Sequence, residues 1–179
     1  MLLESKNIRL RAVEPEDLEF FYKWENSTSM WHIANTLAPY SRYELKRYIA
    51  ASNSIYESKQ QRFMIDFKPE EKTVGTIDLY DFDPHNNRAA VGVFVEESFQ
   101  KRGLAKESLL LLNDYAIQFL GIHQLYAYIL KSNQRSFRLF QRCGFRTKGT
   151  LTDWNKTVFG YEDVRIVSLV SGLSDNLTT

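Results

Sequence analysis

The segment that most constrains the fold runs from residue 88 to residue 130. It opens with Arg88–Val95, a short apolar run that predicts a strand. Apolar residues then recur at positions 109, 112, 116 and 119, which is the spacing of one helical face, so a helix is expected over Ala105–Leu120. A further strand, Gln124–Leu130, follows at once. This strand–helix–strand order predicts an α/β domain with a helix packed on a sheet.

The residues that precede this segment predict an antiparallel meander. Its strands are Arg62–Phe67, Thr73–Tyr80 and the strand Arg88–Val95 itself, and Ile8–Val13 is a separate strand near the N-terminus. Clusters of turn-forming residues at 68–72 and 81–87 separate the later strands. The order of these elements therefore favours strands that pair with their neighbours in sequence.

Two helices are expected within the N-terminal part. Pro15 with its acidic neighbours opens the first, which continues to about Glu25. The second is Ser41–Ile55, and its Ser-x-x-Glu start is a capping box. The segment Asn26–Tyr40 fits either a loop or a short helix.

The C-terminal part is expected to add one short helix and a final hairpin. The helix contains Ser136–Arg142, and the hairpin strands are Phe145–Trp154 and Tyr161–Val170. Together the elements predict a mixed sheet with helices on both faces. We expect a single domain over residues 1–170 and a C-terminal tail over residues 171–179.

Composition and charge narrow the classes of function. The chain has 179 residues and 44% hydrophobic content, which suits one domain. A net charge of +1 gives no bulk attraction to nucleic acid or to an anionic membrane, so neither is an expected partner. No apolar run approaches the roughly 20 residues that span a bilayer. Met1–Leu10 has no apolar signal region, so a cytoplasmic protein is expected.

The cysteine and histidine residues do not indicate a metal or disulfide site. Cys143 is the only cysteine, so no intramolecular disulfide can form, and we expect it in the core or at a helix end rather than as a nucleophile. His32, His85 and His123 are too scattered in the sequence to suggest a metal centre, and no metal is expected.

The turn between the strand and the long helix carries the strongest chemical signal. The start of a helix exposes unpaired backbone N–H groups and carries about half a positive charge, so it binds phosphate well. Gly103 permits a tight turn and a close approach to a ligand. Lys101, Arg102 and Lys106 add positive charge nearby. Without further context, the same residues fit an ordinary strand-to-helix turn.

Two motifs and the N-terminal segment resemble the GNAT superfamily of N-acetyltransferases. Gln100-Lys101-Arg102-Gly103-Leu104-Ala105 resembles the pyrophosphate loop of the family, Gln/Arg-x-x-Gly-x-Gly/Ala. Asn133-Gln134-Arg135-Ser136, with Leu139-Phe140 and Cys143-Gly144-Phe145 after it, resembles the second signature. Ile8–Arg11 with Glu14–Leu18 is similar to the start of ribosomal-protein-alanine and spermidine N-acetyltransferases. The similarity covers roughly residues 7–170.

The resemblance implies the GNAT fold and acetyl-CoA as a cosubstrate. This α/β (α+β) fold has a mixed, mostly antiparallel central sheet of about seven strands, helices on both faces and a splayed pair of central strands. The pantetheine arm would lie between the splayed strands, like an added strand. The implied cofactor-binding residues are Phe94, Val95, Gln100, Lys101, Arg102, Gly103, Leu104, Ala105, Lys106, Asn133 and Phe140. Helix capping is the alternative role for Asn133.

The catalytic residues are harder to assign. An alkyl amine with a pKa of about 10 must lose a proton before it attacks, and the leaving thiolate can take one. Many relatives place a tyrosine for the second task at the position of Phe140, and phenylalanine cannot donate a proton. Ser136 is the expected substitute because ribosomal-protein acetyltransferases resemble this sequence there. Packing or capping near the helix start is the alternative role for Ser136.

The candidate bases are Asp78, Asp81 and His85, on or just after a strand expected to border the substrate cleft. Asp78 and Asp81 align with glutamates in spermidine acetyltransferases. A carboxylate can accept a proton through water and attract a cationic amine. An ordinary solvated acidic turn is the alternative. Ala90 stands where many relatives have an acid, which leaves the base harder to place.

The expected acceptor is a primary amine. The resemblance near Asp78 and Asp81 and across Asn155–Arg165 favours a small-molecule polyamine such as spermidine. A protein or peptide N-terminus is the second choice, and an amino sugar or antibiotic is the third. A non-catalytic acyl-CoA-binding module is the alternative from another class, favoured by the phenylalanine at position 140. Relatives often self-associate, so a homo-oligomer is a fair expectation.

Overall fold

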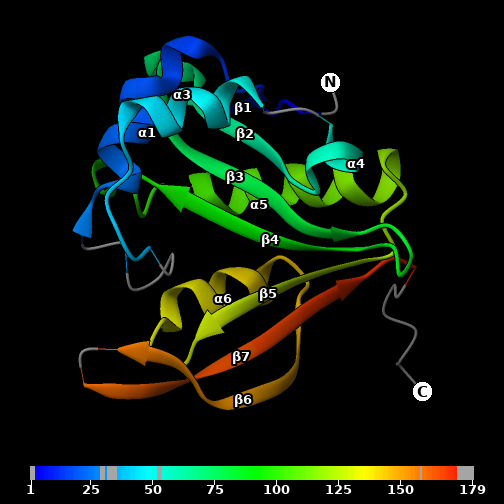
Figure 1. Ribbon diagram of the computed structural model, residues 1–179. Helices are drawn as coiled ribbons and strands as arrows, with labels where there is room; N and C mark the ends of the chain where they lie inside the picture. Colours follow the sequence, from blue (N-terminus) through cyan, green and yellow to red (C-terminus); the bar gives the residue numbers. More distant parts are fainter. Residues whose placement is uncertain (1–2, 29–30, 32–35, 52–53, 158, 173–179) are drawn as a thin grey trace.

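Seven strands form one mixed sheet in the computed structural model, which describes residues 3–28, 31, 36–51, 54–157 and 159–172 (Figure 1). Their spatial order is β1-β2-β3-β4-β5-β7-β6. Among the described strands, only β4 and β5 pair in parallel, and the other neighbours are antiparallel, which confirms the predicted sheet. The strands are β1 (Ile8–Arg11), β2 (Gln61–Phe67), β3 (Lys72–Asp83), β4 (Arg88–Val95), β5 (Gln124–Leu130), β6 (Arg146–Thr157) and β7 (Gly160–Val170).

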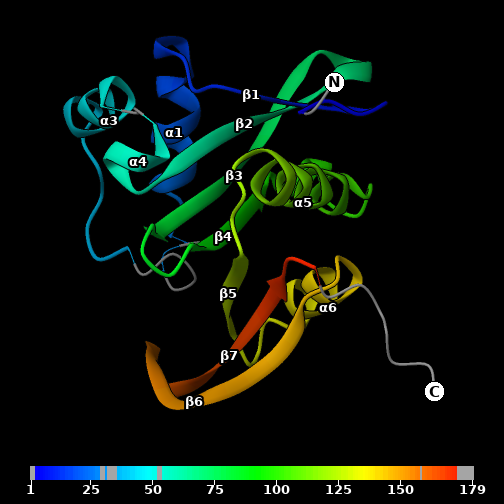
Figure 2. The same ribbon diagram turned by 90° about the vertical axis from the view of Figure 1, so that its right-hand side faces the viewer.

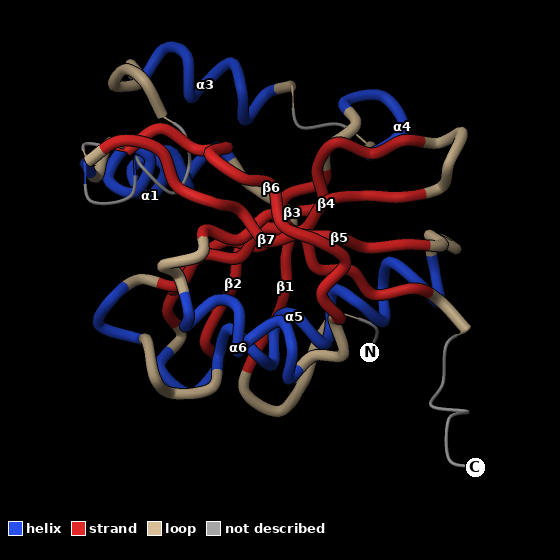
Figure 3. The backbone as a smooth tube through the Cα atoms, turned by 90° about the horizontal axis from the view of Figure 1, so that it is seen from below, coloured by secondary structure: helices blue, strands red, loops and turns tan. Residues whose placement is uncertain are grey.

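Helices cover both faces of the sheet (Figures 2 and 3). α1 (Leu18–Glu25) and α3 (Arg42–Ala50) lie on one face, and α5 (Leu104–Asp114) and α6 (Gln134–Arg142) lie on the other. No helix in the described ranges is long and apolar enough to cross a membrane. The shorter elements are η1 (Pro15–Asp17), α4 (Ile55–Ser58), η2 (Lys68–Glu70), η3 (Glu97–Phe99) and the π-helical turn η4 (Tyr115–Phe119).

The alternation of side chains along the strands gives each face its own apolar core. On β2, Ile65 points into the core beneath α5 with Leu109, whereas Met64 points into the core beneath α1 and α3 with Phe21 and Leu45. All five side chains are buried. The sheet is therefore held from both sides, and its central strands are fixed in register.

Strands β4 and β5 separate after a short paired stretch. Their pairing covers Arg88–Ala90 against Gln124–Tyr126, and within the described residues it extends no further. Beyond that point β4 stays paired to β3, whereas β5 stays paired to β7. The strands therefore enclose an opening between Val91–Val95 and Ala127–Leu130, which we call the β4–β5 wedge. The predicted splayed pair of central strands is confirmed.

Gly75 is required by the close approach of β3 and β4. A Cβ atom built on Gly75 would lie 2.1 Å from the backbone carbonyl oxygen of Phe94. Such a contact is far inside van der Waals distance, so no larger residue fits without moving a strand. The same geometry turns the Phe94 carbonyl toward β3 and away from the wedge.

Several predicted boundaries differ from the structure. The predicted helix Ser41–Ile55 is wrong at its C-terminal end, because α3 ends at Ala50 and Ser54 has an extended backbone (ψ 154°) before α4 begins. The predicted turn 81–87 is shorter than expected, since β3 continues through an irregularity to Asp83. The capping box at the start of α3 is confirmed. Within the ambiguous segment Asn26–Tyr40, positions 29, 30 and 32–35 lie outside the described residues.

Candidate active site

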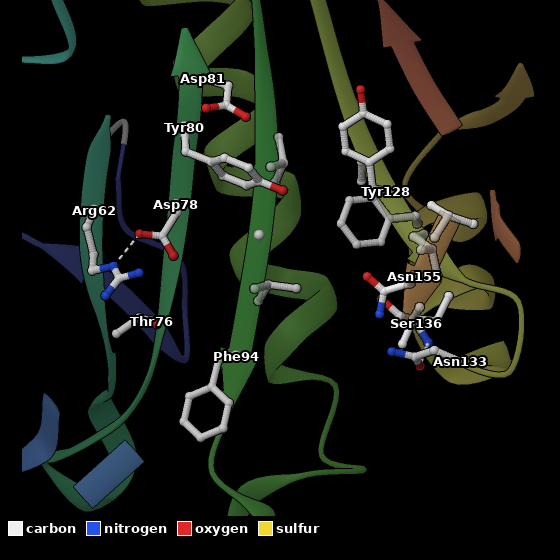
Figure 4. Close-up of a pocket in the computed structure, with 18 of the residues that line it drawn as sticks. Arg62, Thr76, Asp78, Tyr80, Asp81, Phe94, Tyr128, Asn133, Ser136 and Asn155 are labelled. Atoms are coloured by element: carbon white, nitrogen blue, oxygen red, sulfur yellow. Dashed lines mark hydrogen bonds and ion pairs between the residues drawn. The ribbon is translucent and has the colours of Figure 1, made fainter. Parts of the chain in front are cut away.

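The β4–β5 wedge opens into a cavity of about 550 Å³ (Figure 4). β3 forms its floor, and its walls come from α1 and β4 on one side and from β5, α6 and the β6–β7 hairpin on the other. The predicted site residues that line it are Asp78, Asp81, Phe94, Asn133, Ser136 and Phe140. The structure thus gathers the proposed acceptor and cofactor residues of two distant sequence segments around one cavity.

One face of β3 supplies the floor of the cavity. Thr76, Asp78 and Tyr80 alternate onto this face and all line the cavity. In the register of the sheet, Asp78 stands between Arg62 on β2 and Gly92 on β4. Because Gly92 has no side chain, the row leaves room on the side of the wedge, and the ring of Tyr80 occupies part of that room.

The two carboxylate oxygens of Asp78 face different neighbours. The Nε atom of Arg62 donates to Oδ1 of Asp78 in a partly buried ion pair. The second oxygen, Oδ2, lies 4.0 Å from the place that a Cβ atom on Gly92 would occupy. One oxygen is therefore held by a cation, and the other faces the wedge side of the row.

Arg62 is held by more than Asp78. Its Nη1 atom donates to Oε1 of Glu25 at 2.9 Å, and its guanidinium carbon lies 5.4 Å from the ring centre of Phe21. Burial by itself would lower the pKa of Arg62, but the negative charges of Asp78 and Glu25 raise it overall. Arg62 therefore stays charged and fixes the positions of both carboxylates.

Tyr80 and Asp81 lie where β3 becomes irregular. Asp81 has a left-handed backbone (φ 49°) and an exposed side chain at the cavity mouth. Burial, followed by the charge of Asp81, raises the pKa of Tyr80 to about 12. Tyr80 is therefore a neutral hydroxyl donor at physiological pH. In Figure 4 its ring extends from β3 across β4 toward β5.

Trp24 brings an unsatisfied donor to the cavity wall. The residue is 7% exposed, and its ring packs against Phe94 with centroids 5.3 Å apart. Its indole Nε1–H is buried and has no hydrogen-bond partner among the described residues. A buried donor left without a partner is costly, so this group is suited to a carbonyl oxygen of a ligand.

On the opposite wall, α6 begins beside the open end of the wedge. The side chain of Asn133 caps the helix, and its Oδ1 accepts a hydrogen bond from the backbone N–H of Ser136 at 3.1 Å. The capping alternative for Asn133 is thus present, although the residue also lines the cavity. Phe140 is buried, and it packs edge-on against Phe145.

Cys143 has no nucleophilic environment. It is buried at the end of α6, and burial raises the pKa of its thiol. Its Sγ atom faces the backbone carbonyl of Lys106 at 3.9 Å. A protonated, buried thiol outside the cavity lining is a core residue, in keeping with the sequence-based interpretation.

The predicted pyrophosphate loop, residues 100–106, connects β4 to α5 and does not line the cavity. Lys101 and Gly103 have left-handed backbones (φ 62° and 83°), and α5 begins at Leu104. A Cβ atom on Gly103 would meet nothing within 4 Å, so the space beside this glycine is open. Arg102 contributes less charge than expected, because its Nη1 donates to Glu70 at 2.8 Å.

Gln100 bridges the two sides of the wedge near its open end. Its Nε2 atom donates to the backbone carbonyl of Val95 at 2.8 Å, and its Oε1 atom accepts from Arg135 on α6. Backbone groups alternate sides along a strand. Because the Phe94 carbonyl faces Gly75, it is Val93 and Val95, rather than Phe94, whose main-chain groups point toward the wedge.

Other predicted residues lie elsewhere. His85 lies in the exposed turn after β3, where the carboxylate of Asp83 accepts a hydrogen bond from its backbone N–H, and it does not line the cavity. His32 lies outside the described residues. Within the described ranges, no cluster of three or more His, Cys, Asp or Glu side chains could hold a metal ion.

Sequence reasoning missed Arg62, Glu25 and Tyr80. The signal for Tyr80 was available, since it stands two residues after Asp78 on a predicted strand and must share its face. The contribution of Glu25 and Trp24 depends on how α1 docks on the sheet. No pattern within the sequence fixes that docking.

Comparison with known proteins identifies related chains. The family described as "Acetyltransferase (GNAT) domain" matches residues 7–146. The spermidine N(1)-acetyltransferase of Escherichia coli K12 is 25% identical over 148 residues, which is 82% of this chain and 77% of that protein. The spermine/spermidine N(1)-acetyltransferase of Bacillus subtilis is 33% identical over 82 residues, which is 45% of this chain and 53% of that protein.

Solved structures share the fold. The Vibrio cholerae spermidine N-acetyltransferase in complex with CoA and spermine has a TM-score of 0.84 at 21% identity, over 93% of this chain and 96% of that one. A dodecameric structure of spermidine N-acetyltransferase from the same organism has a TM-score of 0.78 at 23% identity, over 93% of this chain and 95% of that one.

Proposed function

This chain belongs to the GNAT family and is an acetyl-CoA-dependent N-acetyltransferase, and from that premise we propose that its acceptor is a polyamine of the spermidine type. The amine would attack the thioester directly while both substrates are bound. Protein N-termini are the alternative acceptors. The proposal follows the substrate named for the Escherichia coli relative, but it rests on the chemistry of this cavity.

The charge of the cavity wall is the observation that carries the proposal. Among the described residues, three carboxylates, those of Glu25, Asp78 and Asp81, and one guanidinium, that of Arg62, line the cavity. This excess of acid favours a cationic acceptor. Aromatic rings at the mouth, including the 62% exposed Trp154, can cover the methylene segments and ammonium groups of a polyamine.

The cosubstrate would extend beyond the Phe94 end of the cavity, into the loop that leads from β4 to α5. The backbone N–H groups at the start of α5, after Gly103, would hold the pyrophosphate. Main-chain groups of Val93 and Val95 would pair with the pantetheine arm, for which Gln100 must release the Val95 carbonyl. When bound, acetyl-CoA supplies the activated acetyl group.

Asp78 is our proposed base. Its Oδ2 atom faces the wedge side of the row and can take the ammonium proton of the acceptor through a water molecule. Asp81, exposed at the mouth, would bind a second ammonium group of the same substrate. Backbone N–H groups of β4 in the wedge are the candidates for stabilising the oxyanion. Ser136 stays a candidate donor for the leaving thiolate.

An acceptor panel tests the proposal. The protein is incubated with labelled acetyl-CoA and either spermidine, a peptide with a free N-terminus or an amino sugar. We expect label on spermidine, with a KM that rises with salt because the attraction is electrostatic. Label on the peptide alone would overturn the polyamine assignment. Tight binding of acetyl-CoA with no turnover on any amine would instead support the non-catalytic alternative.

The dodecameric state of the Vibrio cholerae relative suggests that this chain also self-associates. Light scattering of the purified protein measures the assembly directly. A monomer at micromolar concentration would contradict this part of the proposal.

A further inference from the structure

Building on the proposed acetyl transfer, we propose that Tyr80 is the catalytic proton donor to the leaving thiolate, the task for which position 140 has no suitable side chain. No sequence motif points to Tyr80. The inference rests on the register of the sheet, on the glycine at position 92 and on the direction of the tyrosine ring.

The first step is the place of Tyr80 in the sheet. Tyr80 pairs with Ala90 on β4, and Ala90 pairs with Tyr126 on β5. This row is the last one that joins the two strands before they separate. Tyr80 therefore stands at the closed end of the β4–β5 wedge, where an arm that enters from the loop after β4 must end.

The second step is the room given by Gly92. A Cβ atom on Gly92 would lie 3.5 Å from Cε1 of Tyr80, so the ring lies directly over the glycine. Figure 4 shows the hydroxyl end of Tyr80 directed across β4 toward β5. The hydroxyl is thus aimed at the wedge rather than at the solvent or at β2.

The third step is the register of the arm. The pantetheine arm has two amide groups, and the main-chain groups that face the wedge nearest its open end are those of Val95 and Val93. An arm whose amides pair there places its thioester next along β4, beside Gly92. Ser136 lies instead in the first turn of α6, which follows the other end of β5. Tyr80 is therefore better placed than Ser136 to reach the sulfur.

Each proton that Tyr80 gives up is returned to it within the site. As the acceptor nitrogen forms its bond to the acetyl carbon, the carbon–sulfur bond breaks and its electron pair goes to sulfur. The phenol of Tyr80 gives its proton to that sulfur, and the phenolate regains a proton from the acylated nitrogen, directly or through water. Tyr80 is neutral before and after, which suits a hydroxyl whose pKa is raised to about 12. The products are an amide and free CoA thiol.

The variant Tyr80→Phe removes the hydroxyl and keeps the ring over Gly92. We expect kcat for the preferred amine to fall about 100-fold, the KM for acetyl-CoA to stay within about twofold, and the solvent deuterium isotope effect on kcat to change. Tyr126→Phe is the matched control, because Tyr126 stands in the same row but does not line the cavity. It should keep kcat. An unchanged kcat in Tyr80→Phe would overturn the inference.

A second measurement needs no acceptor. A donor that contacts the sulfur stabilises the thiolate, so free CoA bound to the wild-type protein should have a lower thiol pKa than CoA bound to Tyr80→Phe. The thiolate absorbance in the ultraviolet follows this titration, and Cys143 contributes equally to both proteins. Equal thiol pKa values would refute the assignment of Tyr80 even if no amine were acetylated. If no amine is acetylated but the thiol pKa of bound CoA still differs between the wild type and Tyr80→Phe, only the proposed acceptor is contradicted.

Discussion

Asp78 and Arg62 are direct partners across strands β3 and β2, and their ion pair forms part of the floor of the cavity. Both side chains are largely buried, with 12% and 16% exposure. A buried pair of this kind costs desolvation, and its geometry must be good to be retained. Here it fixes one oxygen of Asp78 and leaves the other beside Gly92. The same ion pair therefore joins β2 to β3 and holds the proposed base in position.

Asp78→Asn tests that arrangement. The amide cannot take a proton from the acceptor, so we expect kcat for spermidine to fall about 100-fold. Asp81→Asn is the comparison, because Asp81 is exposed and is proposed to bind rather than to react. It should raise the KM for spermidine several-fold at low salt with a smaller change in kcat. Steady-state kinetics on both variants separate the two effects, and equal kcat losses would contradict the division of tasks.

Gly103→Ala tests the open helix start. Gly103 has φ 83°, so alanine costs about 1 kcal/mol of folding free energy at this position. Gly121→Ala is a matched control, since Gly121 also has a positive φ (68°) and open space around it but lies outside the loop. Both variants should lose a similar amount of unfolding free energy, as measured by urea denaturation. Only Gly103→Ala should weaken CoA binding, by about tenfold in calorimetry, and equal affinities in both variants would argue against the loop as the pyrophosphate site.

Much of the fold could be predicted because its signals are local. Arg88–Val95 and Gln124–Leu130 were predicted with the bounds that the structure shows, since each is a short apolar run with clear turns on both sides. The end of α3 was not, because Ile55 continues the helical spacing, whereas in the structure Ser54 is extended and Ile55 begins a separate turn that packs into the core with the sheet. Tertiary packing overrides local pattern at such positions.

The candidate site was predictable only where a motif carried it. The loop after β4 and the start of α6 are continuous segments, so their residues could be named in advance. The ion pair of Arg62 with Asp78 depends on the register of two strands, and the register row of Tyr80 depends on three. Register is set by the whole sheet and the packing of its faces, so these relationships emerge only from the folded chain.

Gly75→Ala should disrupt the pairing of β3 with β4. The added methyl group would lie 2.1 Å from the carbonyl oxygen of Phe94, a backbone atom that cannot rotate away. We expect a loss of about 3 kcal/mol or more in unfolding free energy. Gly149→Ala is the control, because Gly149 lies in β6 with nothing within 4 Å of the new methyl group. Chemical denaturation of the two variants measures the difference, and a similar small loss in both would show that the strands can separate at little cost.

Alkaline pH should destabilise the fold through Tyr48 and Tyr80. Burial is the main cause that raises the pKa of each to about 12. An unfolded tyrosine ionises near pH 10, so between about pH 10 and about pH 12 the folded chain holds more protons than the unfolded one. The stabilisation is fully present below about pH 10 and is lost as the pH rises through about 12. Urea unfolding at a series of alkaline pH values measures the unfolding free energy. This free energy should fall less steeply with pH in Tyr48→Phe than in the wild type. An equally steep fall in both proteins would show that the ionisation of Tyr48 does not contribute.

The variant Phe140→Tyr, made in the Tyr80→Phe background, tests whether a tyrosine at position 140 can replace Tyr80 as the proton donor. Phe140 lines the cavity from α6, so a hydroxyl on its ring offers a donor from the wall opposite Tyr80. We expect the double variant to regain about tenfold in kcat over Tyr80→Phe alone. The same change in the wild-type background should have little effect, since Tyr80 already donates the proton. The thiol titration of bound CoA should follow kcat in all four proteins. A gain in kcat from Phe140→Tyr that is equally large in both backgrounds would mean that Tyr80 and the new tyrosine act independently, and the assignment of Tyr80 as the donor would then be wrong.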